Sequence, residues 1–319
     1  MAEQKIILTG ASGTLGHHVL EQLATVPNVK VLALLRATSR IRKNYDFVRF
    51  EIVDFYDHHA VNKIIKRFDP TALIHCAAGT TRFDRANWFD MIGFNVNGTL
   101  RLCECVSHVS GCHFVYIGTG LAYKDQGRRL RETDALDTHH PYGASKAAAD
   151  LLVRAAAAEF GVKLTVLRPF SFSGTADDRE RLFPGILRAA AENRPFDLAP
   201  GDQIRDYCAA QDIAQGIVAA CLQADNEAGA LRIFNLGSGE SETLKTLIER
   251  VKAELGLEVE LRFGARSYTP FEPKFMVADV TAARKSLGWK PRTNLSYAVW
   301  QLAQEYLPQL KVNRPAELR

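Results

Sequence analysis

The sequence lacks the paired Cys-x-x-Cys spacing, although its 319 residues include six cysteines. Those cysteines lie mostly among apolar neighbours, at positions 76, 103, 105, 112, 208 and 221. We therefore expect buried, reduced thiols in a cytoplasmic protein. Adjacent histidines occur at 17–18, 58–59 and 139–140, without partners at metal-site spacing. We predict no metal site.

Long hydrophobic runs and a strong charge of either sign are also missing. No apolar stretch approaches the length of a membrane-spanning helix, and we expect no signal peptide, because the first residues lead straight into a predicted strand. The net charge of +4 does not require a nucleic acid or an acidic membrane as a partner. With 47% hydrophobic and 24% charged residues, the composition is ordinary for a soluble globular protein.

Apolar runs alternate with stretches of helical periodicity through the first half of the chain. We predict strands at 5–9, 29–35, 47–53, 71–76, 113–117 and 162–167. We predict helices after residue 14 and at 57–68, 87–108 and 141–160. This alternation is typical of an α/β fold with a doubly wound parallel sheet.

Beyond residue 169 the alternation loosens. Helical patterns recur at 211–222, 243–255, 279–287 and 294–307, and a strand at 232–236 is expected to rejoin the main sheet. The sequence shows no repeat and no low-complexity linker. We therefore predict one domain over 1–171, to which 208–236 return, and a smaller substrate-binding domain built from 172–207 and 237–319.

Gly10, Gly13 and Gly16 stand between the first predicted strand and the first predicted helix. Glycine allows a tight turn and lets backbone N–H groups approach a pyrophosphate closely. The start of the helix adds a dipole that favours an anion. Because this context distinguishes a nucleotide site from a plain glycine turn, we predict a Rossmann-like, dinucleotide-binding domain.

Tyr142 and Lys146 are four residues apart at the start of the predicted helix 141–160, so they share one helix face. A free tyrosine has a pKa of about 10, and a neighbouring cation lowers it. Reaching a pKa of about 7 takes about 4 kcal/mol, and one exposed ion pair supplies only about 0–1 kcal/mol. A catalytic pair would therefore need a dry pocket and a second positive charge, such as an oxidised nicotinamide ring. The alternative is chance spacing on a helix.

The glycine pattern at 9–16 and Tyr-x-x-x-Lys at 142–146 resemble the extended short-chain dehydrogenase/reductases, over nearly the whole chain. The resemblance implies a catalytic set of Thr119, Tyr142 and Lys146. Tyr142 would exchange a proton with the substrate oxygen, and Thr119 would hydrogen-bond that oxygen. Lys146 would lower the pKa of Tyr142 and hold the nicotinamide ribose.

The same resemblance places the cofactor along several segments. Asp54 matches the acidic residue that contacts adenine, residues 77–79 match the loop over the cofactor, and Asn95 matches a helix asparagine of sugar-nucleotide members. The expected cofactor-binding residues are Thr9, Gly10, Ser12, Gly13, Thr14, Leu15, Gly16, Arg36, Arg40, Asp54, Phe55, Cys76, Ala77, Ala78, Gly79, Asn95, Tyr142, Lys146, Pro169 and Phe170.

The cofactor preference depends on the end of the second predicted strand. NAD-specific relatives carry an acid there, which bonds the adenine ribose and repels a 2′-phosphate. Counting from the glycine loop, that position is Leu35, and Arg36, Ser39 and Arg40 follow. A guanidinium can stack on adenine and pair with the phosphate. We therefore predict NADP(H), carried mainly by Arg36, with use of either cofactor as the alternative.

Arg205-Asp206-Tyr207, followed by Asp212, resembles a signature of nucleotide-diphospho-sugar epimerases and reductases. The planar fork of Arg205 suits a diphosphate; the alternative is a structural ion pair with a nearby carboxylate. The resemblance implies a nucleotide-diphospho-sugar as substrate. The expected substrate-binding residues are Thr80, Thr81, Thr119, Ser171 and Arg205.

Two departures from the pattern of sugar-nucleotide enzymes restrict the set of reactions that we expect. Ser171 stands where many epimerases have asparagine, and Gly120-Leu121 follow Thr119 where 4,6-dehydratases have Asp-Glu. Without that acid/base pair dehydration is not expected. We expect reduction of a 4-keto-sugar. The alternatives are a 4-epimerase, a reductase of a non-sugar carbonyl and a non-catalytic cofactor sensor.

Family members are commonly dimers through two helices each, so we expect a homodimer.

Overall fold

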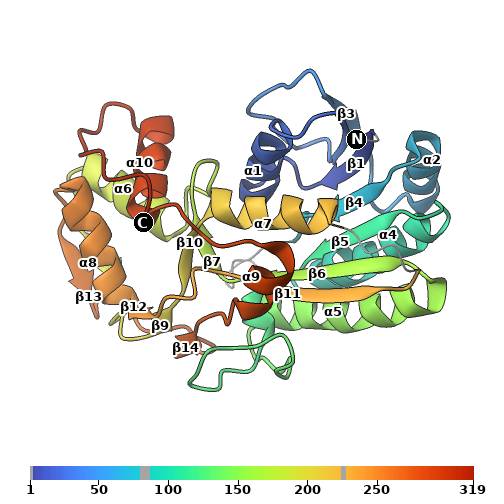
Figure 1. Cartoon of the computed structure of the whole chain (residues 1–319). Coiled ribbons are helices and arrows are strands. Elements are labelled where there is room, and N and C mark those ends of the chain that lie inside the picture. Colours follow the sequence, from blue (N-terminus) through green and yellow to red (C-terminus); the bar gives the residue numbers. More distant parts are fainter. Residues whose placement is uncertain (1–2, 80–86, 224–227) are drawn as a thin grey trace.

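A parallel sheet of seven strands forms the centre of the protein, seen in the computed structural model, which describes residues 3–79, 87–223 and 228–319 (Figure 1). In spatial order the strands are β11 (Leu231–Leu236), β6 (Lys163–Pro169), β5 (His113–Ile117), β4 (Ala72–His75), β1 (Gln4–Thr9), β2 (Val29–Leu35) and β3 (Val48–Ile52). Every neighbouring pair is parallel. The order reverses between β1 and β4, which confirms the predicted doubly wound, Rossmann-like sheet.

Helices cover both faces of this sheet and bury two hydrophobic cores. One core packs α1 (Thr14–Leu23) and α7 (Ala210–Leu222) against the sheet, through residues such as Leu20 and Ile213. The other lies under α2 (His58–Phe68), α4 (Gly98–Ser107) and α5 (Pro141–Phe160), and includes Val61, Leu102 and Val153. The strands read as continuous apolar runs because both faces of the sheet are covered.

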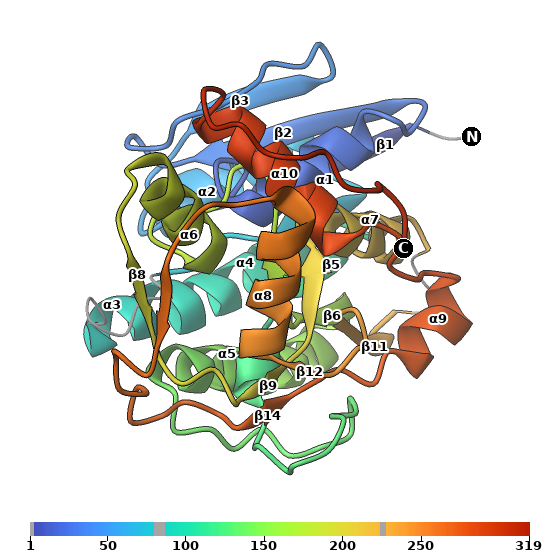
Figure 2. The ribbon, with the colours of Figure 1, turned by 90° about the vertical axis from the view of Figure 1, so that its left-hand side faces the viewer.

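A third hydrophobic cluster is buried among helices on the carboxyl side of the sheet; Figure 2 shows these helices in front of the sheet. Its helices are α6 (Leu182–Ala191), α8 (Leu244–Leu255) and α10 (Leu295–Tyr306). Short strands surround it: β7 (Ser171–Ser173) with β10 (Tyr207–Ala209), β8 (Phe196–Leu198) with β13 (Leu261–Phe263), and β12 (Glu242–Thr243) with β9 (Ile204–Arg205) and β14 (Phe275–Met276). Helix α9 (Thr281–Leu287) packs near β11 instead. The domain boundaries given above remain a proposal.

The predicted helix at 87–108 is not one regular α-helix. It consists of α3 (Trp88–Met91), a π-helical turn η2 (Ile92–Asn97) and α4. A π turn inserts one extra residue without changing the apolar periodicity much, so the sequence pattern does not reveal it. The wider turn carries the buried Asn95, whose Oδ1 accepts the N–H of Gly79 and whose Nδ2 donates to Ser145 Oγ.

The expectations about cysteines, metal sites and membrane-spanning helices can be compared with the described residues. All six cysteines are free thiols, and Cys76 is the one that is only partly buried. Residues 3–79, 87–223 and 228–319 contain no group of three or more histidine, cysteine, aspartate or glutamate side chains placed to hold a metal ion. Within those ranges, no helix is both long and apolar enough to cross a membrane.

Candidate active site

Helix α5 begins one residue before Tyr142. Pro141 occupies the first helical turn, where its missing N–H costs nothing, and the His140 side chain caps the helix by accepting the N–H of Gly143 at 3.3 Å. A Cβ on Gly143 would lie only 2.2 Å from the carbonyl oxygen of Leu121. The glycine therefore lets the start of α5 pack against the loop that follows Thr119.

The glycine loop packs against the loop that follows β4. Gly10 has a φ of +77°, and a Cβ there would lie 2.5 Å from the backbone nitrogen of Ala77. A Cβ on Gly16 would lie 2.1 Å from the carbonyl oxygen of Gly10. A side chain at position 10 would push the glycine loop away from the loop after β4, and one at position 16 would push α1 away from Gly10. The approach of the glycine loop to a pyrophosphate remains a prediction.

A cavity of about 660 Å³ lies at the carboxyl ends of the strands and brings most of the predicted site together. The predicted residues that line it are Gly10, Ser12, Gly13, Thr14, Leu15, Gly16, Arg36, Phe55, Cys76, Ala77, Ala78, Gly79, Thr119, Tyr142, Pro169, Phe170, Ser171 and Arg205. The carboxyl end of a parallel sheet, near the point where the strand order reverses, is where doubly wound folds bind their ligands.

Five other predicted residues do not line the cavity. Thr9 lies below the cavity, and its Oγ1 accepts the N–H of Ala77 at 3.3 Å. Asn95 supports the same loop after β4, because its Oδ1 accepts the N–H of Gly79. Asp54 Oδ1 accepts the N–H of Tyr56 in a turn. Arg40 is exposed, and Lys146 is buried beneath the cavity. The last two predicted residues, Thr80 and Thr81, lie outside the described part of the chain.

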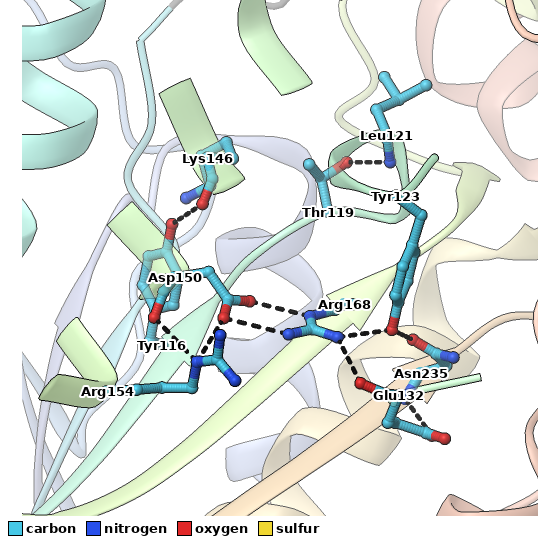
Figure 3. Close-up of polar contacts among 10 residues, drawn as sticks. All are labelled: Tyr116, Thr119, Leu121, Tyr123, Glu132, Lys146, Asp150, Arg154, Arg168 and Asn235. Carbon is cyan, nitrogen blue, oxygen red and sulfur yellow. Dashed lines mark hydrogen bonds and ion pairs between the residues drawn. The ribbon is translucent and has the colours of Figure 1, made fainter. Parts of the chain in front are cut away.

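Burial sets the protonation of the Tyr142–Lys146 pair. It raises the pKa of Tyr142 to about 12, against a smaller lowering effect of the Arg181 charge. It lowers the pKa of Lys146 to about 7. Lys146 Nζ lies 4.3 Å from the centroid of the Tyr116 ring (Figure 3). In the protein alone, burial therefore keeps Tyr142 as a neutral phenol. The lowered pKa expected from the sequence requires a second positive charge, such as an oxidised nicotinamide ring, and remains a prediction.

A buried polar network joins the segment that follows β5 to β6 and β11 (Figure 3). Arg168 Nη1 donates to the hydroxyl of Tyr123 at 2.7 Å and to the carbonyl of Glu132 at 3.0 Å. That tyrosine hydroxyl donates in turn to Asn235 Oδ1 at 2.7 Å. Thr119, four residues before Tyr123, accepts the N–H of Leu121 through its Oγ1. The network thus joins Arg168, next to Pro169 at the end of β6, to Tyr123 and to Asn235 of β11.

Arg205 lines the cavity, but its hydrogen bonds go to the protein. It forms an ion pair with Glu272 and donates to the carbonyls of Ile204 and Pro273, at 2.9 and 2.8 Å. These contacts favour the structural ion pair that the sequence left open. Binding of a diphosphate by Arg205 remains a prediction.

Among the cavity-lining residues that sequence reasoning missed are Phe94, Phe172 and Arg181. The guanidinium carbon of Arg36 lies 5.5 Å from the centroid of the Phe94 ring, and that of Arg181 lies 4.8 Å from the centroid of the Phe172 ring. Arg181 belongs to the charged run 177–181, in a segment with little periodic pattern. The density of charged residues in this segment was the one sequence feature that could have indicated a role for Arg181 in the site.

The match to a protein family agrees with this geometry. Residues 6–237 match the NAD dependent epimerase/dehydratase family. The chain belongs to this family. The match confirms the resemblance to extended short-chain dehydrogenase/reductases and the expectation of an enzyme of that type.

Individual relatives span nearly the whole chain. The chain is 26% identical to the UDP-glucose 4-epimerase of Lacticaseibacillus casei, over 90% of this chain and 91% of that protein. It is 27% identical to the dTDP-glucose 4,6-dehydratase of Neisseria meningitidis serogroup B, over 95% and 93%. The solved UDP-glucuronic acid 4-epimerase of Bacillus cereus, in complex with UDP-glucuronic acid and NAD, superposes with a TM-score of 0.84. That structure is 23% identical, over 95% of this chain and 100% of the other, so it shows a shared fold.

Proposed function

We propose that this protein transfers a hydride between a nicotinamide cofactor and carbon 4 of a nucleotide-diphospho-sugar. One observation carries the proposal: Thr119 and Tyr142 line the same cavity as the glycine loop. The glycine loop and the loop after β4 would hold the dinucleotide, which supplies the hydride chemistry when bound. The half of the cavity lined by Ser171 and Arg205 would take the sugar nucleotide.

The protonation of Tyr142 supports the reductive direction. A keto oxygen that receives a hydride at its carbon also needs a proton. A phenol with a pKa of about 12 is protonated at neutral pH and can donate that proton. Thr119 would hydrogen-bond the same oxygen, and Lys146, one helical turn below Tyr142, would hold the nicotinamide ribose. We therefore propose reduction of a 4-keto-sugar as the reaction.

A 4-epimerase is the second candidate, because relatives of this chain are named UDP-glucose 4-epimerase. Such an enzyme oxidises carbon 4, turns the keto-sugar and reduces it again. Dehydration is not proposed, because Gly120 and Leu121 line the cavity where the dehydratase pattern has an acid/base pair.

One assay separates the two candidates. Purified protein is given UDP-sugars or dTDP-sugars, with and without added NADH or NADPH, and the products are separated by chromatography. A reductase converts a 4-keto-sugar only with stoichiometric reduced cofactor, whereas a 4-epimerase converts a 4-hydroxy-sugar without added cofactor. Absence of both conversions, and of competition by UDP or dTDP, would contradict a nucleotide-sugar function and leave a non-sugar carbonyl or a non-catalytic role.

The cofactor is a nicotinamide dinucleotide, as the family name states. The Bacillus cereus neighbour contains NAD, and the comparisons give no support for NADP as the main cofactor. A preference for NADP(H) is our proposal from Arg36 alone.

We also propose a homodimer in the cytoplasm. The outer face of α5 exposes Leu151 and Leu152, at 50% and 45%, and Ile92 of the neighbouring η2 is exposed at 45%. Apolar side chains gathered on adjacent helices are typical of a surface that a second copy covers. Light scattering of the purified protein tests the assembly, and Leu151→Glu should produce a monomer.

A further inference from the structure

A histidine caps the helix that carries Tyr142. Pro141 is the first residue of α5 and has no N–H, so the N–H of Gly143 is among the first that need an acceptor from outside the helix. His140 supplies that acceptor through its Nδ1, at 3.3 Å, and its own N–H donates to Thr138 Oγ1 at 3.1 Å. His140 and Gly143 therefore stand on either side of Tyr142 in the chain, and their hydrogen bond holds the first turn in which it lies.

The capped residue is also a contact between α5 and the loop after Thr119. A Cβ on Gly143 would lie 2.2 Å from the carbonyl oxygen of Leu121 and 3.1 Å from Thr138 Cγ2, so its backbone packs directly on both segments. Leu121 in turn donates its N–H to Thr119 Oγ1 at 3.3 Å. The placement of Tyr142 relative to Thr119 therefore depends on the first turn of α5, and hence on its cap.

Histidine differs from the usual cap residues because it can lose its acceptor close to neutral pH. Serine, threonine, asparagine and aspartate keep an acceptor oxygen there. An imidazole accepts at Nδ1 only while that nitrogen carries no proton; in the protonated ring both nitrogens are donors. The added positive charge would also face the positive end of the helix dipole. Protonation of His140 would therefore break its bond to Gly143 and drive the ring away from the helix.

The surroundings of His140 keep its ring neutral at pH 7. Burial lowers its pKa from 6.5, and the negative charge of Glu272 raises that pKa to a smaller extent. Glu272 lies between β13 and β14 and is itself paired with Arg205. On the helix side, the ring of Tyr142 lies edge-on to the imidazole, at a centroid distance of 6.5 Å, and is a neutral phenol. His139, the preceding residue, is exposed.

We propose that His140 is a positioning residue for Tyr142, and that its cap is present when the imidazole is neutral and absent when the imidazole is protonated. Neutral His140 holds the first turn of α5 against the loop after Thr119. Protonated His140 releases that turn, so the placement of the proton donor changes as the pH falls. The inference rests on the proposed function for the role of Tyr142 in turnover, and adds to it a residue that does not touch the substrate.

Nuclear magnetic resonance of the full chain with isotope-labelled tyrosine tests the positioning without a substrate. The ring signal of Tyr142 is assigned by its absence in Tyr142→Phe. His140→Asn keeps a cap acceptor that does not titrate, His140→Ala has no acceptor, and His139→Asn is the matched control. Lowering the pH from 7 to 5 should move the Tyr142 signal in the wild type and in His139→Asn, and leave it in place in His140→Asn. At pH 7, His140→Ala should show the signal where the wild type has it at pH 5.

Three results of this experiment would overturn the inference. The first is an equal movement of the signal in His140→Asn and the wild type. The second is no movement in the wild type. The third is a signal in His140→Ala that stays at the pH 7 position of the wild type, because the charge of the imidazole, and not the loss of the cap, would then cause the movement.

Turnover of the UDP-sugar or dTDP-sugar that the assay above converts gives the second readout. Between pH 7 and pH 5 the wild type should lose about fivefold more turnover than His140→Asn, which is the size of one lost helix cap. His140→Ala should be about fivefold slower than the wild type at pH 7 and should lack that extra loss. Equal acid losses in the wild type and His140→Asn would overturn the inference. If no sugar nucleotide is converted, the proposed function fails, and the tyrosine signal still decides whether His140 positions Tyr142.

Discussion

Asp150 and Arg168 form a two-pronged ion pair in which both side chains are 1% exposed: Nε donates to Oδ2 at 2.8 Å and Nη2 to Oδ1 at 3.1 Å. Asp150 is on α5, one turn after Lys146, and Arg168 is at the end of β6 (Figure 3). The pair therefore joins the helix that carries Tyr142 to the strand end that carries Pro169.

Removing one member of this ion pair should lower the free energy of unfolding substantially. Asp150→Leu leaves a buried guanidinium without its counter-charge, and we expect the free energy of unfolding to fall by about 3–5 kcal/mol. Arg154→Ala removes a second, more exposed partner of Asp150, and should cost about 1 kcal/mol or less. Urea denaturation measures both. A loss below about 1 kcal/mol for Asp150→Leu would contradict the prediction.

Tyr142→Phe should reduce turnover by about a hundredfold or more, because it removes the positioned proton donor. The variant should still bind cofactor, since the glycine loop is untouched. Tyr297→Phe removes a hydroxyl from a tyrosine that does not line the cavity, and should keep wild-type turnover. Steady-state kinetics and cofactor titration provide the measurements. Near-normal turnover of Tyr142→Phe would remove this residue from the mechanism.

Much of this site could be predicted from sequence because its signals are local. Gly10, Gly13 and Gly16 follow a short apolar run and precede a helical pattern, and that order alone fixes where the loop must lie. Pro141 at the helix start likewise sets Tyr142 in the first turn of α5. Local constraints of this kind do not depend on the rest of the fold.

Other features depend on contacts between distant segments. Arg205 meets Glu272, a residue 67 positions later in the chain, and no spacing rule indicates which carboxylate an arginine will find. The π turn that carries Asn95 keeps the apolar pattern of an ordinary helix. Arg181 lies in a loop without periodicity, so its place in the cavity follows from the packing of α6 rather than from a motif.

The buried His75 should make the protein less stable in acid. Its Nδ1 lies 2.7 Å from Thr9 Oγ1 and its Nε2 3.1 Å from Thr99 Oγ1. Burial lowers its pKa from 6.5 to about 3, with a smaller effect of the Lys146 charge. Between these two pH values the unfolded chain binds a proton that the folded chain does not. The free energy of unfolding therefore falls as the pH falls, by up to about 1.4 kcal/mol per pH unit for each such proton.

Urea denaturation at pH 7 and pH 5 isolates this contribution when variants are compared. His75→Asn should be less stable at pH 7, because it alters a buried hydrogen-bonded position, but should lose less stability between the two pH values than the wild type. His59→Asn, at an exposed position, should lose as much as the wild type. The same pH sensitivity in His75→Asn and the wild type would show that His75 does not cause it.

The choice of cofactor should depend on Arg36. Leu35, the last residue of β2, is 6% exposed and apolar, so it cannot bond the adenine ribose or repel a 2′-phosphate. Arg36 lines the cavity beside Phe94, and its N–H donates to Ser39 Oγ at 3.2 Å. An exposed guanidinium held over an aromatic ring at this place can pair with the phosphate. We therefore expect a lower dissociation constant for NADPH than for NADH.

Arg36→Ala should raise the dissociation constant for NADPH about tenfold and leave that for NADH within about twofold, because one charge-assisted hydrogen bond is lost. Arg49→Ala is the matched control, since Arg49 is exposed and does not line the cavity; it should change neither constant by more than about twofold. Fluorescence titration of the reduced cofactors measures all of these constants. Tighter binding of NADH by the wild type, or unchanged NADPH binding in Arg36→Ala, would show that Arg36 does not select NADP(H), and that the Leu35 position tolerates NAD without an acid.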